Sequence, residues 1–214
     1  MTVITISREY GTLGDEIAQG VADQMNMPVA DKATFRNLLA EYGLINFTDF
    51  YETEHSMLDR FVQSNQDVIS VLNEGIKGYA KEDNVIIRGR GGFAILQNYS
   101  NVLNVLIQEP LETRAWKHIQ KTEVYVDEDA VQFVKEKDNV RTSFLHTYYG
   151  VKQVEAGMFD LVIDSSIIPV DLAVKWICEM AEYLKDNPQT RMPSTQTIEV
   201  DPIMLDAVRK QLQK

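Results

Sequence analysis

The first twenty-five residues predict a short strand, a glycine-containing turn and a helix. Thr2–Ile6 is apolar and β-branched, as a buried strand would be, and the turn Ser7–Gly14 follows it. From Asp15 onward, the apolar side chains that recur every four residues, the period of one helix face, are Ile17, Val21 and Met25. Such a turn directs backbone N–H groups and the positive end of the helix dipole at one point, which favours a phosphate group. The opening therefore predicts an anion site at the end of the first strand.

The charges in this turn depart from the phosphate-binding loop pattern G-x-x-x-x-G-K-[ST]. When the pattern ends on Gly14, Glu9 stands at the first glycine, Asp15 at the lysine and Glu16 at the Ser/Thr. Asp15 therefore brings a negative charge toward a bound polyphosphate. Glu16 has two interpretations: an oxygen ligand for magnesium, or an exposed acid favoured by the helix dipole.

Composition restricts the class of protein. The 214 residues are enough for one domain with its own core, and 44% hydrophobic and 25% charged residues are ordinary for a globular protein. We expect neither a membrane span nor a signal peptide. The lone Cys178 lies in an apolar helical stretch, which predicts a small core residue and a cytoplasmic location. The net charge of −11 argues against broad binding to nucleic acid or anionic membranes, and no Cys/His spacing predicts a metal site.

Helices and short strands alternate along the chain. The predicted strands after the first are 27–30, 84–88, 102–107 and 159–163. The predicted helices are 31–42, 47–64, 66–81, one opened by Pro110, 127–149 and 169–185. This alternation predicts an α/β fold with a parallel sheet and helices on both faces, in which ligands bind at the carboxyl ends of the strands. The residues that follow strands, and should therefore share that rim, are Ser7, Gly89–Gly92, Glu109 and Asp164–Ser166.

The C-terminal part has a different composition. Residues 186–197 are rich in Asn, Pro, Gln, Ser and Thr, which predicts a linker. A short helix then begins at Asp201-Pro202, and its predicted apolar face carries Leu205, Val208 and Leu212. We expect that face to dock on this chain or on a second copy in a homodimer, and fraying of the terminus is the alternative.

Cations at the predicted strand ends point to a phosphate ligand. Arg8 lies in the first turn, and Arg88 and Arg90 flank Gly89. A guanidinium group binds phosphate oxygens through two parallel hydrogen bonds, which suits this role. Further cations lie on the two helices that follow: Arg114, Lys117, Lys135, Lys137 and Arg141. For Arg114, Lys117 and Lys135 a solvated helix face is the alternative.

Several segments occur together in one order: I-T-I-S-R-E-Y-G at 4–11, D-K at 31–32, I-R-G-R-G at 87–91, Arg114, K-D-N-V-R at 137–141 and D-L-V-I-D-S at 160–165. Over about residues 2–180 the chain resembles the cytidylate kinase-like family, a branch of the nucleoside monophosphate kinases. The resemblance implies a three-layer P-loop NTPase-like fold over 1–185, a parallel sheet flanked by helices. It also implies a helical acceptor-binding insert at about 31–82 and a lid at about 122–157, with 186–214 outside.

The resemblance also implies the site residues. Gly11, Thr12 and Gly14 would wrap the phosphates of the donor ATP, with Mg²⁺ as the metal. The cations on the donor side would be Arg114 and Lys117. Arg8, which lies in the first turn, is our own candidate to replace the missing lysine. The acceptor-binding residues would be Asp31, Arg88 and Arg90. The catalytic lid residues would be Lys137, Asp138 and Arg141, with Arg141 supplying positive charge to the transition state.

Two functions remain open from the sequence. The first is an ATP-dependent phosphotransferase acting on a nucleoside monophosphate or another small phosphate acceptor. The second is a kinase-like protein that binds a nucleotide or phosphate ligand for regulation. The chain departs from the family pattern at Leu13, which stands in place of a glycine. Two further departures favour the second function: Asp15 in place of a basic residue, and Gly91 in place of an aspartate that contacts the acceptor. In both cases the partner is a small molecule, a nucleotide above all.

Overall fold

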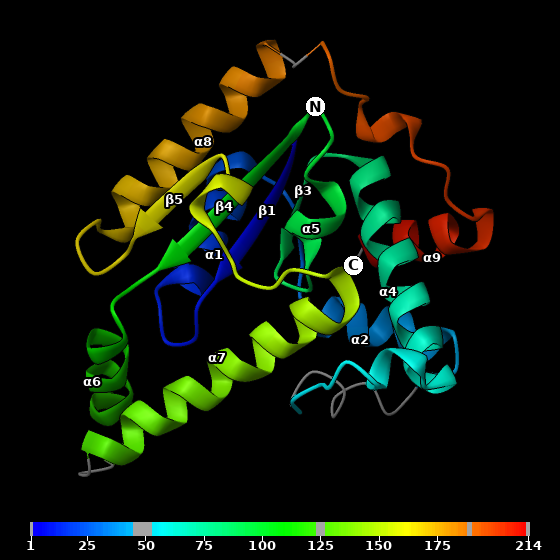
Figure 1. The fold of residues 1–214 in the computed structure, drawn as a ribbon. Helices are drawn as coiled ribbons and strands as arrows, with labels where there is room; N and C mark the ends of the chain where they lie inside the picture. The colour runs from blue at the N-terminus through cyan, green and yellow to red at the C-terminus, as the bar shows by residue number, and fades with distance from the viewer. Residues whose placement is uncertain (1, 45–52, 123–126, 188–189, 213–214) are drawn as a thin grey trace.

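A five-stranded parallel sheet forms the centre of the molecule (Figure 1). The computed structural model describes residues 2–44, 53–122, 127–187 and 190–212. The spatial order of the strands is β2-β3-β1-β4-β5. Their bounds are β1 Val3–Arg8, β2 Val29–Ala30, β3 Val85–Arg88, β4 Val102–Gln108 and β5 Leu161–Asp164. The predicted parallel sheet is confirmed.

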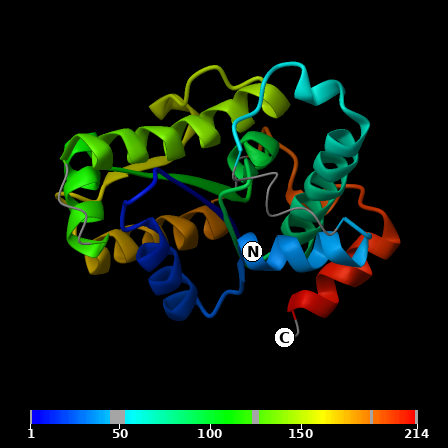
Figure 2. The ribbon, with the colours of Figure 1, turned by 90° about the horizontal axis from the view of Figure 1, so that it is seen from below.

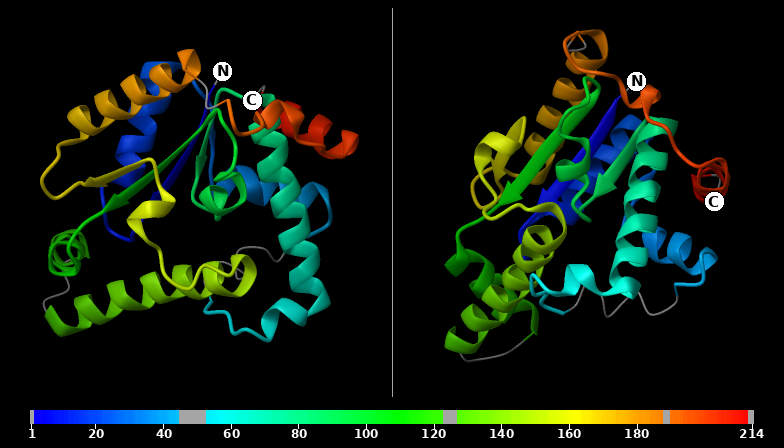
Figure 3. Two further views of the ribbon diagram at one scale, coloured as in Figure 1. Left: turned by 45° about the horizontal axis from the view of Figure 1, so that its top comes forward. Right: turned by 45° about the vertical axis from the view of Figure 1, so that its right-hand side comes forward.

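Helices cover both faces of the sheet, so the fold has three layers (Figures 1 and 3). Side chains of β1 alternate between the two faces: Val3 packs with α4 and α5, while Ile4 and Ile6 pack with α1 and α8. The helix bounds are α1 Gly14–Met25, α2 Lys32–Glu41, α4 Gln63–Glu82, α5 Gly92–Leu96, α6 Leu111–Thr122, α7 Asp127–Tyr149, α8 Val170–Asp186 and α9 Pro202–Leu212, with 3₁₀ turns at η1 Asp59–Phe61, η2 Ala156–Met158 and η3 Thr195–Thr197. Helix α5 was not predicted, because five residues are too few to show a helical period.

Helix α7 lies across the carboxyl-end side of the sheet (Figure 1). Its N-terminal half packs on α6 through Ala115, Ala130 and Val134. Its C-terminal half enters the main core through Phe144 and Leu145. The helix is therefore anchored at both ends over the rim where the predicted site residues gather.

The helix predicted over 47–64 is wrong in its described part. Residues 45–52 lie outside the described residues, and between 53 and 62 the regular structure is the turn η1. The Asp59 carboxylate accepts a hydrogen bond from the Ser56 N–H, a local bond that competes with helix formation. The segment is fastened to α7, since the Ser143 hydroxyl accepts from the His55 N–H at 3.0 Å (Figure 2).

The C-terminal segment docks on this chain. Thr195 is fully buried and exchanges hydrogen bonds with the Asn101 side chain at 2.8 and 2.9 Å, which fixes the end of the predicted linker to the residue before β4. Helix α9 lies beside α4 and α2 (Figure 3). Of the predicted apolar face, Val208 is buried, whereas Leu205 and Leu212 are half-buried; Met204 and Ala207 complete the buried stripe. No helix among the described residues is long and apolar enough to cross a bilayer.

Candidate functional site

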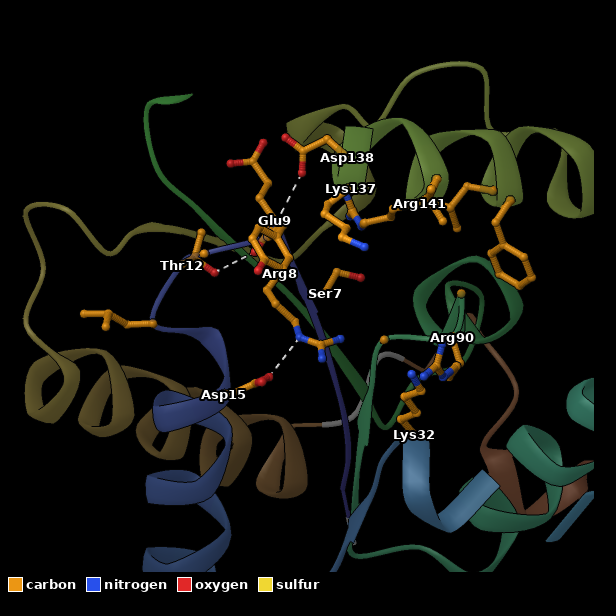
Figure 4. A pocket seen from close by; sticks show the side chains of 18 of the residues that line it. Ser7, Arg8, Glu9, Thr12, Asp15, Lys32, Arg90, Lys137, Asp138 and Arg141 are labelled. Carbon is orange, nitrogen blue, oxygen red and sulfur yellow. Dashed lines mark hydrogen bonds and ion pairs between the residues drawn. The ribbon is translucent and has the colours of Figure 1, made fainter. Parts of the chain in front are cut away.

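A cavity of about 690 Å³ opens at the carboxyl ends of the strands, between the turn after β1 and helix α7 (Figure 4). Seven of its described lining residues are cationic: Arg8, Lys32, Arg90, Lys117, Lys121, Lys137 and Arg141. Four are acidic: Glu9, Asp15, Glu16 and Asp138. In a chain with a net charge of −11, a cavity with an excess of cations is a site for an anion.

The predicted common rim is confirmed by hydrogen bonds between strand ends. The Gly89 N–H donates to the Ile6 carbonyl at 3.0 Å, which joins the ends of β3 and β1. The Glu9 N–H donates to the Ile107 carbonyl at 3.1 Å, which joins β1 and β4. The predicted residues after these strands therefore meet at one edge.

The turn after β1 has the shape of an anion-binding loop. Gly11 has a φ of +82°, a conformation that favours glycine. The Thr12 hydroxyl donates to the Glu9 carbonyl at 3.0 Å and braces the turn. The N-cap of helix α1 is Leu13, whose side chain accepts no hydrogen bond, and the Thr12 hydroxyl accepts one from the Gly14 N–H at 3.4 Å. The next N–H groups of the first turn, those of Asp15 and Glu16, are available to an anionic ligand.

Asp15 belongs to a chain of ion pairs along the rim. Its carboxylate lies 3.0 Å from Arg8 Nε and 3.5 Å from Arg88 Nη1. Arg88 Nη2 in turn lies 2.7 Å from Asp31, the N-cap of α2. Burial alone would raise the pKa of Asp31, but backbone N–H donors in α2 and the charge of Arg88 hold it below its ordinary value. The negative charge that the sequence places in the loop is thus balanced by two guanidinium groups.

Arg114 is a buried connector rather than a residue of a solvated face. Its Nη1 donates to Asp138 at 2.7 Å and to the Tyr10 carbonyl at 3.1 Å, and its Nε donates to the Glu109 carbonyl at 3.0 Å. The side chain is 5% exposed and does not line the cavity. Arg114 therefore joins the turn after β1 to helix α7 from behind the site.

A second buried cluster, which the sequence does not reveal, lies beside this connector. Lys117 Nζ lies 2.7 Å from both carboxylate oxygens of Glu109, whose side chain is fully buried. The Ser165 hydroxyl also donates to Glu109, and it accepts a hydrogen bond from the Leu13 N–H at 3.3 Å. The positions of Glu109 and Ser165 after strands place them on the rim, but only the fold shows that they support the anion-binding turn.

Helix α7 brings the predicted lid residues over the cavity (Figure 4). Asp138 accepts from Arg114 and, at 3.4 Å, from the Tyr10 N–H, so it fastens the helix to the turn. Arg141 Nη2 is buried and has no hydrogen-bond partner among the described residues. Burial lowers the pKa of the Arg141 guanidinium, while the Glu9 and Asp138 carboxylates oppose that change. Buried N–H groups of a cation are strong candidates for an incoming anion.

The predicted site residues divide into two groups. Those that line the cavity are Arg8, Gly11, Thr12, Arg90, Lys117, Lys137, Asp138 and Arg141. Those that do not line it are Gly14, Asp31, Arg88 and Arg114. Gly14 packs against Arg8: a Cβ there would lie 2.6 Å from the Arg8 Cβ. Two more cations line the cavity: Lys32, which belongs to the D-K segment at 31–32 but was not predicted to bind a ligand, and Lys121, which the sequence did not indicate.

Comparison with known proteins gives consistent results. A family model described as "Cytidylate kinase-like family" matches residues 3–167. The chain is 27% identical to the cytidylate kinase of Pyrobaculum islandicum over 188 residues, which cover 86% of this chain and 96% of that protein. It is 34% identical to the cytidylate kinase of Sulfolobus acidocaldarius over 101 residues, which cover 47% of this chain and 54% of that protein.

Solved structures share the fold at low sequence identity. An uncharacterized protein from Eubacterium ventriosum has a TM-score of 0.66 at 22% identity, covering 85% of this chain and 98% of its own. A gluconokinase from Sinorhizobium meliloti has a TM-score of 0.53 at 12% identity, covering 87% of this chain and 97% of its own. A shikimate kinase from Bacteroides thetaiotaomicron has a TM-score of 0.51 at 11% identity, covering 85% of this chain and 98% of its own. These likenesses support the P-loop kinase-like fold of the chain.

Proposed function

The chain belongs to the cytidylate kinase-like family, and we propose that it is an ATP-dependent phosphotransferase for a nucleoside monophosphate or another small phosphate acceptor. The observation that carries this proposal is the cation-lined cavity into which α7 presents the buried, unpartnered Nη2 of Arg141. Phosphoryl transfer makes few covalent demands on the protein, so catalysis consists of positioning and neutralisation of charge. Cations on both sides of the cavity meet that demand.

The residues fit an ATP phosphate chain at the turn after β1. Gly11, Thr12 and the N–H groups of Asp15 and Glu16 would hold the phosphates, with the cation of Arg8 at the end of β1. Lys137 and Arg141 would approach from α7, and Arg90 and Lys32 would hold the anionic group of the acceptor on the other side (Figure 4). The part of the cavity beside the turn after β1 would therefore bind the donor, and the part beside Arg90 and Lys32 would bind the acceptor.

The carboxylates of the cavity would bind magnesium only together with phosphate oxygens of a bound substrate. Among the described residues no cluster of three acidic, His or Cys side chains is preformed for a metal. Asp15 and Asp138 are engaged by arginines. Glu9 accepts a hydrogen bond from the Glu109 N–H and lies 3.6 Å from Arg114 Nε. Glu16, in contrast, is an exposed carboxylate in the first turn of α1 that lines the cavity. Glu16 would therefore hold Mg²⁺, which commonly binds one or two carboxylates together with substrate phosphates and neutralises their charge.

Helix α7, which carries the predicted lid residues, would provide two further requirements of phosphoryl transfer: positive charge at the transferred group and exclusion of water. Asp138 fixes α7 to the turn through Arg114 and the Tyr10 N–H, and this places Arg141 one helical turn further along. Arg141 would neutralise charge that develops on the transferred group. The docked helix would also exclude water, which otherwise hydrolyses the donor.

We expect Mg-ATP to stabilise the protein against thermal unfolding. A ligand at a hundred times its dissociation constant adds about 2.7 kcal/mol, a shift of several degrees for a chain of this size. Differential scanning fluorimetry with and without Mg-ATP checks this, with Mg-free ATP as the control. No shift at millimolar Mg-ATP would contradict the proposed donor site.

The alternative, a protein that binds phosphate ligands without transfer, is favoured by Asp15 and its pairs with Arg8 and Arg88. If Asp15 weakens donor binding, Asp15→Lys should increase Mg-ATP affinity about tenfold or more, because attraction replaces repulsion at the loop. Isothermal titration calorimetry measures the affinity, and Asp23→Lys, an exposed acid on the same helix, is the matched control. Equal affinities of Asp15→Lys and the unchanged protein would rule Asp15 out as the cause.

A further inference from the structure

Glu109, the residue that follows β4, carries a buried charge beside the cavity without lining it. A carboxylate removed from water is stable only when a cation and hydrogen-bond donors compensate its charge. Lys117 Nζ provides that compensation, since it lies 2.7 Å from both carboxylate oxygens. Two of the three N–H groups of Lys117 are thereby engaged. The cation that the family resemblance places on the donor side is therefore the counter-ion of Glu109 in this structure.

The Glu109 carboxylate also determines the direction of the Ser165 hydroxyl. Ser165 follows β5 and is 5% exposed, and its hydroxyl donates to Glu109 Oε1. Because a carboxylate only accepts, the hydroxyl proton is directed to Glu109, and the lone pairs of the oxygen remain for the Leu13 N–H at 3.3 Å. A chain of hydrogen bonds therefore runs from Glu109 through Ser165 to the anion-binding turn.

The backbone of Glu109 is itself held on both sides. Its N–H donates to Glu9 Oε2 at 3.1 Å, and its carbonyl accepts from Arg114 Nε at 3.0 Å. Glu9 is the first residue after β1, and Arg114 lies on α6. The carboxylate therefore extends from a fixed backbone position, and its hydrogen bonds through Ser165 end on the same turn that Glu9 begins.

A fixed turn is an advantage for binding an anion. N–H donors that are already in place need no rearrangement when the ligand arrives, whereas a turn that must first be ordered loses affinity. Leu13 lies between Thr12, which lines the cavity, and Gly14, the first residue of α1. The bond from the Leu13 N–H to Ser165 therefore fixes the backbone that leads into the first turn of α1.

We propose that Glu109 is a positioning residue of the donor site: it fixes the anion-binding turn through Ser165, and Lys117 acts as its counter-ion rather than as a ligand of the donor phosphates. This inference rests on the proposed phosphotransferase function and assigns roles within its donor site. Arg8 and the cations of α7 would meet the phosphates, whereas Lys117 would act through Glu109.

The sign of one change in Mg-ATP affinity distinguishes the two roles of Lys117. By isothermal titration calorimetry, Glu109→Gln should weaken Mg-ATP binding about tenfold, because it removes the charge that holds Lys117 and Ser165 together. If Lys117 were a phosphate ligand, the same variant would release it and strengthen binding, which would overturn the inference. Glu112→Gln, the same change at an exposed position of α6, is the matched control and should stay within about twofold.

A double-mutant cycle gives a readout that a general loss of stability would not produce. Lys117→Met alone should weaken Mg-ATP binding about tenfold, because it leaves the Glu109 carboxylate without its counter-ion. In the Glu109→Gln background, Lys117→Met should change the affinity by less than about threefold. An equal loss in both backgrounds would identify Lys117 as a direct phosphate ligand and overturn the inference.

Ser165→Ala decides the question even if the Glu109 variants do not fold, since it removes only a hydroxyl. It should weaken Mg-ATP binding about fivefold and, in the protein without ATP, speed hydrogen exchange of the Leu13 amide about fivefold or more. Unchanged Mg-ATP affinity in Ser165→Ala would overturn this inference alone. Failure of the unchanged protein to bind Mg-ATP would instead overturn the proposed function, and this inference with it.

Discussion

Arg141→Ala should lower kcat for phosphoryl transfer by about a thousandfold or more, with a much smaller change in Mg-ATP affinity. An arginine that meets the transferred group stabilises charge mainly in the transition state, and removal of such a residue has effects of about this size. The buried Nη2 of Arg141, without a hydrogen-bond partner among the described residues, is the observation behind this expectation. Release of ADP in a coupled assay with an accepted phosphate ester measures kcat.

Two variants separate this role from a general effect of charge. Lys135→Ala removes an exposed cation on the same helix that does not line the cavity, and it should leave kcat within about twofold. Arg141→Lys keeps the charge but loses the planar fork, and it should recover only part of the activity. An unchanged kcat in Arg141→Ala would remove Arg141 from the mechanism, and a loss that appeared only in KM would assign it to ground-state binding.

Arg114→Ala should destabilise the protein by about 3 kcal/mol, a decrease in melting temperature of roughly 10 °C. The side chain is buried and donates hydrogen bonds to the Asp138 carboxylate, the Tyr10 carbonyl and the Glu109 carbonyl. Its removal leaves these acceptors without their donor, although Asp138 retains some contact with water, which limits the cost. Urea unfolding monitored by circular dichroism gives the free energy of unfolding.

The matched control for Arg114→Ala is Lys175→Ala, which removes an exposed partner of Glu179 at 3.9 Å and should not change stability measurably. Activity should also fall in Arg114→Ala, because α7 loses its connection to the turn after β1. A free energy of unfolding within about 0.5 kcal/mol of the unchanged protein would show that Arg114 is not the connector that its contacts describe.

The sequence alone predicted the sheet and its rim because the signals for them are local. The apolar run Thr2–Ile6, the glycines of the turn and the four-residue period after Asp15 are each decided within a few residues. Parallel strands then bring their carboxyl ends to one edge, whatever the details of packing. Eight of the twelve predicted site residues line the cavity. Four of these lie at or after the ends of strands, whereas Lys117, Lys137, Asp138 and Arg141 lie on α6 and α7 and were implied by the family resemblance.

Only the tertiary structure decided which side chains those residues meet. Asp15 lies seven residues from Arg8 but 73 from Arg88, and Asp138 lies 24 from Arg114, so no local pattern reveals these pairs. The same holds for the tail, where Thr195 pairs with Asn101, and for Tyr149, which meets Gly91 and Asn73. Local preference determines which elements form and in what order along the chain. The charge balance of the loop depends on contacts between residues far apart in sequence, which exist only after the sheet has assembled.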